Sequence, residues 1–370
     1  MLIYLICFSI CIFFHYLADK TNVRLYKLIL IFFPILLLSL LAGFRDMGIG
    51  TDTEIYSEMY FEGAMSLNSL TDLFTETFDL LPNKGYIALN YFSQLLYSEL
   101  WMVWFLQELL ILCCTYCAVL KIGKRYDIQL YVFSILYLFA FYNVSYNYMR
   151  QLCAMSICLL AMSYYFENKK IVFLLLFTIA FFFHTSSSIC FIILAIYHIS
   201  KKKVNLTKVL LCLFVGYIIL FFYYYDVLFI IGRLGVFSEV YMDRYGVDTP
   251  HPGERVPYSF MIIILVIYCG LWLSWHKKII SREDIVFVIL VHTTFLFMMF
   301  LSLYAETLKR LSYYSYLVVV VYMGICLSSE RMSRLYRIFF LLLIIFAWWY
   351  SYMHLNGNET YPYKSTILGI

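Results

Sequence analysis

Long apolar runs, separated by short polar connections, constrain the fold of this chain more than any other feature. The run LILIFFPILLLSLLA at residues 28–42 is one example, and similar runs recur along the chain. A helix needs about 20 mostly apolar residues to cross the ~30 Å hydrocarbon core of a bilayer. Charged residues make up only 14% of the chain, against about 25% in soluble domains. The sequence therefore predicts an all-α polytopic membrane protein, with one integral membrane domain over residues 1–370.

Hydropathy predicts about twelve transmembrane or re-entrant helices. They lie at residues 2–18, 27–43, 100–120, 129–142, 148–166, 171–183, 186–199, 207–225, 258–275, 285–304, 311–328 and 336–353. The segments 171–183 and 186–199 are short, and we predict two helices there because lysine clusters flank the pair on both sides. Residues 44–99 are predicted as an extracytoplasmic loop with interfacial helices at 53–61 and 84–97, and residues 226–257 as an extracytoplasmic loop or lid.

Basic residues predict the orientation of these helices. Most of the 27 Lys and Arg residues fall in six alternate connections, at residues 20–27, 121–125, 169–170, 201–208, 277–282 and 331–337. Short loops rich in Lys and Arg face the cytoplasm. Both termini are therefore predicted to be extracytoplasmic. The first apolar run has no basic n-region and no cleavage site, so we expect it to remain as a span.

Unusual polar side chains gather on the predicted outer connections. The candidate site residues there are Arg45, Asp52, Tyr56, Arg150, Gln151, His184, Arg255, Glu306 and Arg310. Arginine makes forked contacts with phosphate oxygens, so these connections favour a phosphate or diphosphate ligand at the outer leaflet. The alternative for any one of these arginines is that its side chain extends to the lipid headgroups.

Arg150 and Glu108 are predicted to lie inside the helix bundle. Ala154, Cys158 and Ala161 fall on roughly one side of the helix that follows Arg150, and small residues let helices approach closely. Arg150 should therefore face the bundle interior, where its charge needs an anion. Glu108 lies within a predicted span and is a candidate anion, either as a substrate contact or as half of a structural ion pair.

His184 stands beside three serines in FHTSSS and is a candidate general base, although a positioning role is equally open. HTSSS does not match a nucleophile elbow. The remaining histidines lack metal-ligand spacing, and no Walker A motif, Rossmann glycine signature or zinc site is present. We therefore expect no cofactor, no metal and no nucleic-acid partner. The 11 cysteines lie in or beside apolar runs and are predicted to act as small packing residues.

Three segments resemble, in order, the EpsG family of Wzy-like polysaccharide polymerases. They are FRDMGIGTDTEIY (44–56), YNYMRQLCAMSICLLA (146–161) and FFFHTSSSICFIILA (181–195). ETLKRLSYYSY (306–316) and YPYKS (361–365) are compatible with the family, and the resemblance covers most of the chain. One departure is Lys84 before Gly85, where the family often has an acidic residue. Either the substrate differs or another carboxylate takes that role.

The resemblance implies a bacterial polymerase of exopolysaccharide, capsule or O-antigen. Such an enzyme joins undecaprenyl-diphosphate-linked oligosaccharides at the outer face of the cytoplasmic membrane, when an acceptor hydroxyl displaces the lipid diphosphate. A fold similar to GT-C-type membrane glycosyltransferases would follow. So would contact with membrane lipids and with a chain-length regulator and a flippase of the same pathway.

The same resemblance suggests roles for the candidate residues. Arg45, Arg150 and Arg310 would hold the diphosphate. His184 or Asp52 would take the proton of the acceptor hydroxyl. The other substrate contacts would be Arg255, Gln151, Tyr56, Glu108 and Glu306.

Two other classes of function stay open. A transporter or flippase of lipid-linked oligosaccharide would use the same arginine-lined cavity without making a bond. A membrane acyltransferase that modifies glycans would need a clearer His/Asp motif. A flippase should carry charged residues through both leaflets, whereas the polar motifs here lie mostly on one side. A structural assembly subunit is disfavoured, because five polar connections converge.

Overall fold

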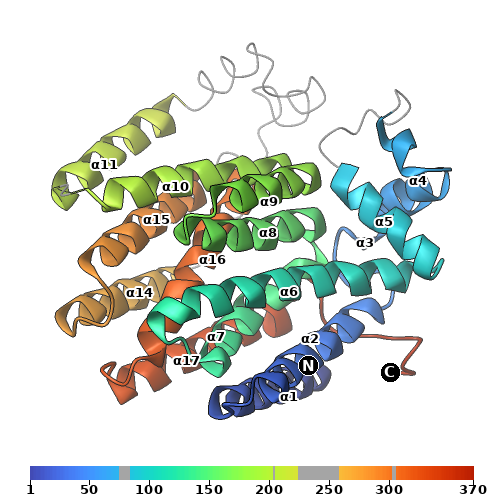
Figure 1. The fold of residues 1–370 in the computed structure, drawn as a ribbon, viewed down its shortest axis with the longest axis horizontal. Helices are drawn as coiled ribbons and strands as arrows, with labels where there is room; N and C mark the ends of the chain where they lie inside the picture. The colour runs from blue at the N-terminus through green and yellow to red at the C-terminus, as the bar shows by residue number, and fades with distance from the viewer. Residues whose placement is uncertain (75–83, 203–204, 224–257, 302–305) are drawn as a thin grey trace. The chain divides into compact units, whose positions relative to one another are not determined.

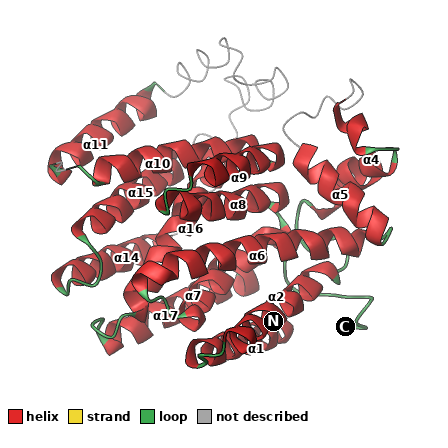
Figure 2. Cartoon of the chain, in the orientation of Figure 1, coloured by secondary structure: helices red, strands yellow, loops and turns green. Residues whose placement is uncertain are grey.

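A computed structural model of the chain is built of helices in the residues that it describes (Figures 1 and 2). It describes residues 1–74, 84–202, 205–223, 258–301 and 306–370. No strand occurs within these ranges. The predicted all-α class is therefore confirmed. The predicted loop or lid at 226–257, which contains Arg255, lies outside the described residues.

Each segment predicted as a span contains a helix. These helices are α1 (Leu2–Lys20), α2 (Arg24–Gly43), α6 (Leu100–Tyr126), α7 (Leu130–Tyr137), α8 (Met149–Phe166), α9 (Lys170–Phe183), α10 (Ile189–Ser200), α11 (Leu206–Phe222), α14 (Tyr258–His276), α15 (Arg282–Leu301), α16 (Glu306–Ser328) and α17 (Arg334–Trp348). Among the described residues, six helices are long and apolar enough to cross a membrane, namely α1, α2, α6, α15, α16 and α17. Twelve spans and a GT-C-type fold stay predictions.

Shorter elements occupy the connections. They are α3 (Thr53–Tyr56), the π-helix η1 (Ser57–Phe61), α4 (Glu62–Met65), the 3-10 helix η2 (Leu70–Phe74), α5 (Lys84–Leu96), the π-helix η4 (Leu138–Tyr142), the 3-10 helices η5 (Asn143–Tyr146) and η6 (Thr185–Ser188), the π-helix η7 (Trp349–His354) and the 3-10 helix η8 (Gly357–Glu359). Helices are present in both segments, 53–61 and 84–97, and their place at the extracytoplasmic membrane interface stays a prediction. The two short helices predicted on either side of HTSSS are confirmed as α9 and α10.

The chain forms two compact units, residues 1–190 with 323–370, and residues 191–322. In the first unit α1 packs on α2 and α7, α6 packs on α2 and α8, and α8 packs on α9. The loop helix α5 packs on α6 and α9. The described helix α5 of the first long loop is therefore held against two long helices of its own unit.

An aromatic cluster forms part of the core of the first unit. Tyr4 and Phe8 of α1 contact Tyr142, with ring centroids 6.4 and 5.2 Å apart, and Trp348, at 6.4 and 5.8 Å. The Tyr142 hydroxyl donates to the Leu38 carbonyl at 2.7 Å. Buried tyrosines need such partners, so the cluster fixes α1, α2, η4 and the end of α17 against one another.

The second unit is built around α15. α11 and α14 both pack on it, and Phe287 of α15 contacts Tyr197 and Tyr322 at 5.8 and 5.6 Å. Side-chain caps mark two helix starts. The Asn205 amide oxygen accepts the Lys208 N–H at 3.2 Å, and Ser281 Oγ accepts the N–H at the third position of α15 at 3.2 Å. Such caps satisfy N–H groups that have no partner inside the helix.

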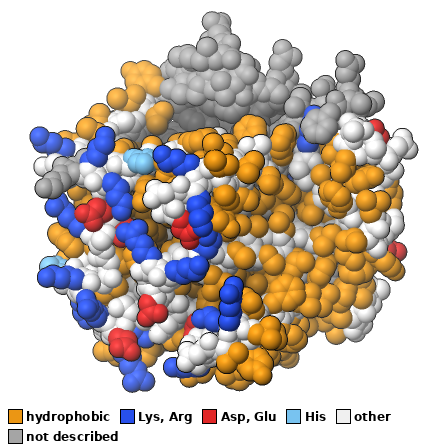
Figure 3. Space-filling model, viewed as in Figure 1, with side chains coloured by type: hydrophobic (Ala, Val, Ile, Leu, Met, Phe, Trp, Pro, Cys, Tyr) orange, Lys and Arg blue, Asp and Glu red, His pale blue; other side chains and the backbone are white. Residues whose placement is uncertain are grey.

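The surface suits a lipid environment. Large apolar side chains such as Phe13, Leu25 and Phe32 are exposed on α1 and α2. Figure 3 shows hydrophobic side chains over much of one face, while Lys and Arg gather on another part of it. Apolar patches of this extent are rare on soluble monomers, and lipid tails would cover them. The helices and this surface together indicate a membrane protein.

Candidate functional site

The loop after α2 approaches the turn before α8 at Gly50. This glycine has φ +103°, and a Cβ there would lie 2.9 Å from Asn147 Oδ1 and 3.0 Å from the Tyr146 carbonyl. The next residue, Thr51, donates a hydrogen bond from Oγ1 to Asn147 Oδ1 at 3.1 Å. The segments GIGTD and YNYMR, far apart in the sequence, thus meet at a contact that only glycine allows.

Arg150 lies at the start of α8 against two tyrosines of the first loop. Its Nε donates to the Tyr56 hydroxyl at 2.8 Å, and its guanidinium carbon lies 5.0 Å from the centroids of Tyr56 and Tyr60. Both rings also contact Tyr86 of α5, at 5.5 and 5.3 Å. Burial raises the pKa of Tyr60 to about 12, although nearby Arg150 opposes the shift. Arg150 therefore faces a neutral phenol, which suits a cation–aromatic contact.

Arg45 lies deeper and has a different environment. It is 2% exposed, and its guanidinium carbon lies 4.3 Å from the ring centroids of both Trp104 and Tyr146. Nη1 donates to the Ala42 carbonyl at 2.7 Å, but Nε and Nη2 have no hydrogen-bond partner among the described residues. Burial lowers the pKa of Arg45, and the neighbouring Tyr146 and Glu108 oppose that shift. Because an arginine side chain stays protonated in proteins, Arg45 is a buried cation of this unit.

Glu108 supports the same turn from α6. It is fully buried, and its Oε2 accepts the Ser145 hydroxyl at 2.6 Å. Gln107, its neighbour, donates from Nε2 to the Ser145 carbonyl at 3.2 Å. Glu108 Oε1 has no hydrogen-bond partner among the described residues. The two α6 side chains therefore hold η5, the turn that leads to Arg150.

His184 ends α9 and caps η6. Its Nδ1 accepts the Ser186 backbone N–H at 3.2 Å and lies 2.6 Å from Ser186 Oγ. Because a backbone N–H can only donate, Nδ1 is the acceptor and the neutral ring carries its proton on Nε2. Gly85 of α5 packs here too, since a Cβ on it would lie 3.0 Å from Phe183. His184 is therefore built into the fold, one residue beyond the contact between α9 and α5.

The structure brings some of the predicted site residues together. Arg150 and Tyr56 are in contact, and Asp52 follows Thr51 in the loop that reaches Asn147. Gln151 is buried within α8. Asp52 is the N-cap residue of α3, but its side chain makes no cap hydrogen bond to that helix. Arg310 belongs to the second unit, and the side chain of Glu306, like Arg255, lies outside the described part of the chain.

Tyr60 and Tyr86 were not predicted as site residues. Tyr56 and Tyr60 are four residues apart and therefore lie on one face of a helical segment. This spacing within a polar loop was the available signal for Tyr60. No such signal marks Tyr86, because its position depends on how α5 packs against α6. In the described ranges, no three His, Cys, Asp or Glu side chains are close enough to hold a metal ion.

The EpsG family model matches residues 28–365. This range includes the loop after α2, the turn before α8 and the HTSSS turn. No curated protein matches the chain, and no solved structure matches it.

Proposed function

Because this chain belongs to the EpsG family, the family of Wzy-like polysaccharide polymerases, we propose that it lengthens a bacterial surface polysaccharide. The family implies lipid-linked oligosaccharide substrates and a membrane location. In our proposal the carrier is undecaprenyl diphosphate, and the reaction takes place at the outer face of the cytoplasmic membrane. The polymer is an exopolysaccharide, a capsule or an O-antigen.

The observation that carries this proposal is the contact of Arg150 with Tyr56 and Tyr60. It joins two segments that resemble family motifs, GTDTEIY and YMRQ, and it holds a guanidinium among aromatic rings. A fixed cation is what a departing diphosphate needs, because negative charge grows on it in the transition state. Aromatic rings and hydroxyls also suit sugar faces. We therefore assign the diphosphate to Arg150 and the adjoining sugar to the tyrosines.

The proposed reaction is a glycosyl transfer. A hydroxyl oxygen of the acceptor unit attacks the anomeric carbon of the donor chain. The bond from that carbon to the diphosphate oxygen breaks, and its electron pair leaves with the lipid diphosphate. The hydroxyl proton passes to a base. In this proposal the buried charge of Arg45 also stabilises the leaving group, and Gln151, Glu108, Arg255, Glu306 and Arg310 remain proposed substrate contacts.

Asp52 is our proposed base. It follows Thr51, which touches Asn147, and it is only half-buried. His184 is the less favoured choice, because its Nδ1 already accepts from Ser186 and its Nε2 carries a proton. A positioning role for His184 fits these contacts better. Replacing His184 by Asn would keep a hydrogen-bond acceptor for the Ser186 N–H. If His184 only positions this turn, the variant should keep its function.

The test is Arg150→Ala in cells that lack the chromosomal copy of the gene. We expect the variant to reach the membrane at normal levels, to make no long polymer and to accumulate single lipid-linked repeat units. Arg334→Ala is the matched control, because Arg334 is exposed at the start of α17. It should give the normal distribution of chain lengths, as measured by gel electrophoresis of the polymer and mass spectrometry of the lipid-linked glycans.

Two results would contradict parts of this proposal. Normal chain lengths in the Arg150→Ala variant would remove Arg150 from the reaction. Repeat units trapped on the cytoplasmic side of cells without the gene would indicate a flippase.

A further inference from the structure

The segment after α17 packs against the loop that follows α2. The C-terminal end of the chain lies near the end of α2 (Figure 1). Thr366 N donates to Asp46 Oδ1 at 2.6 Å, between residues 320 positions apart. Asp46 N donates in turn to the Lys364 carbonyl at 3.0 Å. These two bonds place residues 364–366 against the first loop of the candidate site.

Three consecutive residues of this segment, Asn358, Glu359 and Thr360, form what we call the 358–360 bridge. Three hydrogen bonds, each 3.0 Å long, join the bridge to the site: Asn147 Nδ2 donates to the Asn358 carbonyl, the Gly50 N–H to the Glu359 carbonyl, and Asn143 Nδ2 to Thr360 Oγ1. One bond reaches the GIGTD loop and two reach the turn before α8. The bridge therefore links the two segments that meet at Gly50.

The backbone of the bridge has an unusual conformation. Asn358 has φ 64° and Glu359 has φ 52°, in the left-handed region that residues other than glycine rarely adopt. Such residues persist where surrounding contacts hold them, and they concentrate at functional sites. Here the carbonyls of these two residues are the acceptors for Asn147 and Gly50.

Thr360 is the best-anchored residue of the bridge. It is fully buried, and its carbonyl accepts the Tyr4 hydroxyl at 2.8 Å. Its partner Asn143 is held on both sides, because Asn143 Oδ1 accepts Trp348 Nε1 at 2.8 Å. Asn143 begins η5, which leads through Asn147 to Arg150. Thr360 can therefore act on Arg150 through this turn without touching it.

We propose that residues 358–360 are positioning residues of the polymerase site. They hold the GIGTD loop and the turn before Arg150 in a fixed position relative to each other. The bridge supplies two backbone carbonyls and one hydroxyl, and none of these needs to touch substrate. The catalytic consequence rests on the function proposed above. The positioning of the two segments by the bridge does not depend on that function, so the positioning and the catalytic consequence can be tested separately.

The first test measures amide hydrogen exchange in the purified full-length protein. Thr360→Val keeps the shape of the side chain but removes the acceptor of Asn143. We expect exchange of the Gly50 amide to become about tenfold faster, because a buried donor is left unpaired and the bridge opens. Thr360→Ser keeps the hydroxyl and should restore protection. Ile367→Ala, at an exposed side chain of the same segment, should change nothing.

The second test measures polymer length in cells. Thr360→Val should shorten the polymer at a normal membrane level of protein, and Thr360→Ser should restore its length. Unchanged Gly50 exchange in Thr360→Val would overturn the positioning role. Faster exchange with normal polymer length would overturn the link between the bridge and the reaction. If cells without the gene still make normal polymer while the Gly50 effect persists in the purified protein, the proposed function fails and the positioning stands.

Discussion

At the scale of single residues, two glycines of one loop carry different constraints. Gly48 has φ +90° and open space where a Cβ would lie, whereas Gly50 has φ +103° and also touches Asn147 and Tyr146. At both positions a side chain would be strained by the positive φ angle, but only at Gly50 would it also clash with neighbouring atoms. Comparing alanine substitutions at Gly48 and Gly50 therefore separates the effect of backbone strain from the effect of a steric clash.

We predict that Gly50→Ala is more harmful than Gly48→Ala. Gly48→Ala should cost about 1–2 kcal/mol, because a side chain is strained at positive φ. Gly50→Ala should cost a further ~1–3 kcal/mol, since the turn before α8 must move to make room. Thermal unfolding of the purified variants and the polymer length in cells would show the difference. Equal effects of the two substitutions would contradict the close approach.

The environment of Arg45 was only partly predictable. Its position after an apolar run, in GFRD, marked it as a cation at the end of a span. The sequence suggested a contact at the surface, whereas the structure buries the guanidinium between Trp104 and Tyr146. Those rings come from α6 and from the turn before α8. No local pattern indicates which rings will meet there, because the contact depends on tertiary packing.

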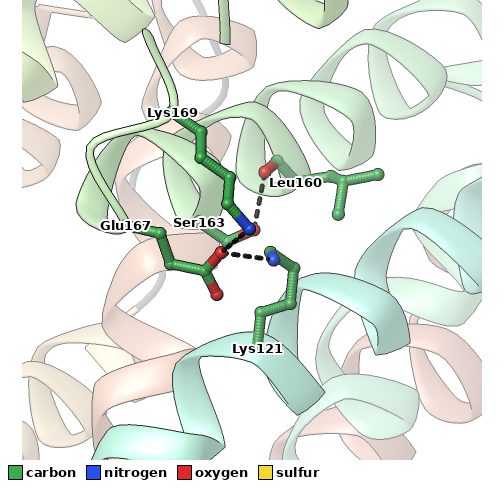
Figure 4. Close-up of polar contacts among 5 residues, drawn as sticks. All are labelled: Lys121, Leu160, Ser163, Glu167 and Lys169. Carbon is green, nitrogen blue, oxygen red and sulfur yellow. Dashed lines mark hydrogen bonds and ion pairs between the residues drawn. The ribbon is translucent and has the colours of Figure 1, made fainter. Parts of the chain in front are cut away.

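At the scale of elements, a charged cluster ties α6 to the connection between α8 and α9 (Figure 4). Glu167 Oε2 accepts from Lys121 at 2.8 Å and from Lys169 at 2.9 Å. Hydrogen bonds from these two lysines lower the pKa of Glu167 to about 2. The cluster lies on connections predicted to be cytoplasmic, at the opposite ends of α8 and α9 from Arg150 and His184.

The stability contributed by Glu167 should depend on pH. Because the folded-state pKa is lowered from about 4.5 to about 2, the contribution is present above pH 4.5 and is lost as pH falls towards 2. Partial exposure limits it to less than about 1 kcal/mol. We expect Glu167→Gln to lower Tm slightly at pH 7, with the gap to wild type closing below pH 4.

Glu330→Gln is the control for this experiment, because Glu330 is an exposed carboxylate between α16 and α17. Its Tm should match that of wild type at every pH. A Tm gap for Glu167→Gln that is unchanged at pH 3 would contradict the assignment of the effect to its charge. High salt should also narrow the gap, since it screens exposed pairs.

Hydropathy predicted the helices but not their irregular turns. The segments 129–142 and 336–353 were predicted as plain spans, yet they end in the π-helices η4 and η7. A π-turn changes the hydrogen-bond register without changing composition, so apolar counting cannot detect it. The aromatic contacts of Tyr142 and Trp348 accompany these turns, and such contacts form only once distant helices are packed.

At the scale of the whole molecule, the twelve predicted segments were all found as helices because apolar length is a strong and local signal. The 358–360 bridge was not predictable. It depends on single hydrogen bonds between residues hundreds of positions apart, and it has neither periodicity nor composition to mark it. YPYKS, which follows the bridge, is compatible with the family, but this resemblance does not indicate what the segment contacts.

The predicted orientation can be tested by cysteine labelling. Ser187 is buried but Thr185 is exposed, so Thr185→Cys is the suitable probe of the HTSSS turn. In a background without the exposed Cys117, Cys212 and Cys269, an impermeant thiol reagent should label it in intact cells. Lys170→Cys should react only after permeabilisation. Labelling of Lys170→Cys in intact cells, with Thr185→Cys labelled only after permeabilisation, would show that the predicted orientation is wrong.

The hydrogen bonds between Thr360, Asn143 and their neighbours also set an order of events during synthesis. The ribosome makes the turn before Arg150 about 200 residues before it makes Thr360, which corresponds to roughly 10–40 s of translation at ~5–20 residues per second. Throughout that interval the GIGTD loop and the turn before α8 are already made, but the 358–360 bridge that bonds to both of them is not. A nascent chain therefore cannot form these hydrogen bonds until the segment after α17 has been made, so the two loops must wait for a partner that is synthesised much later.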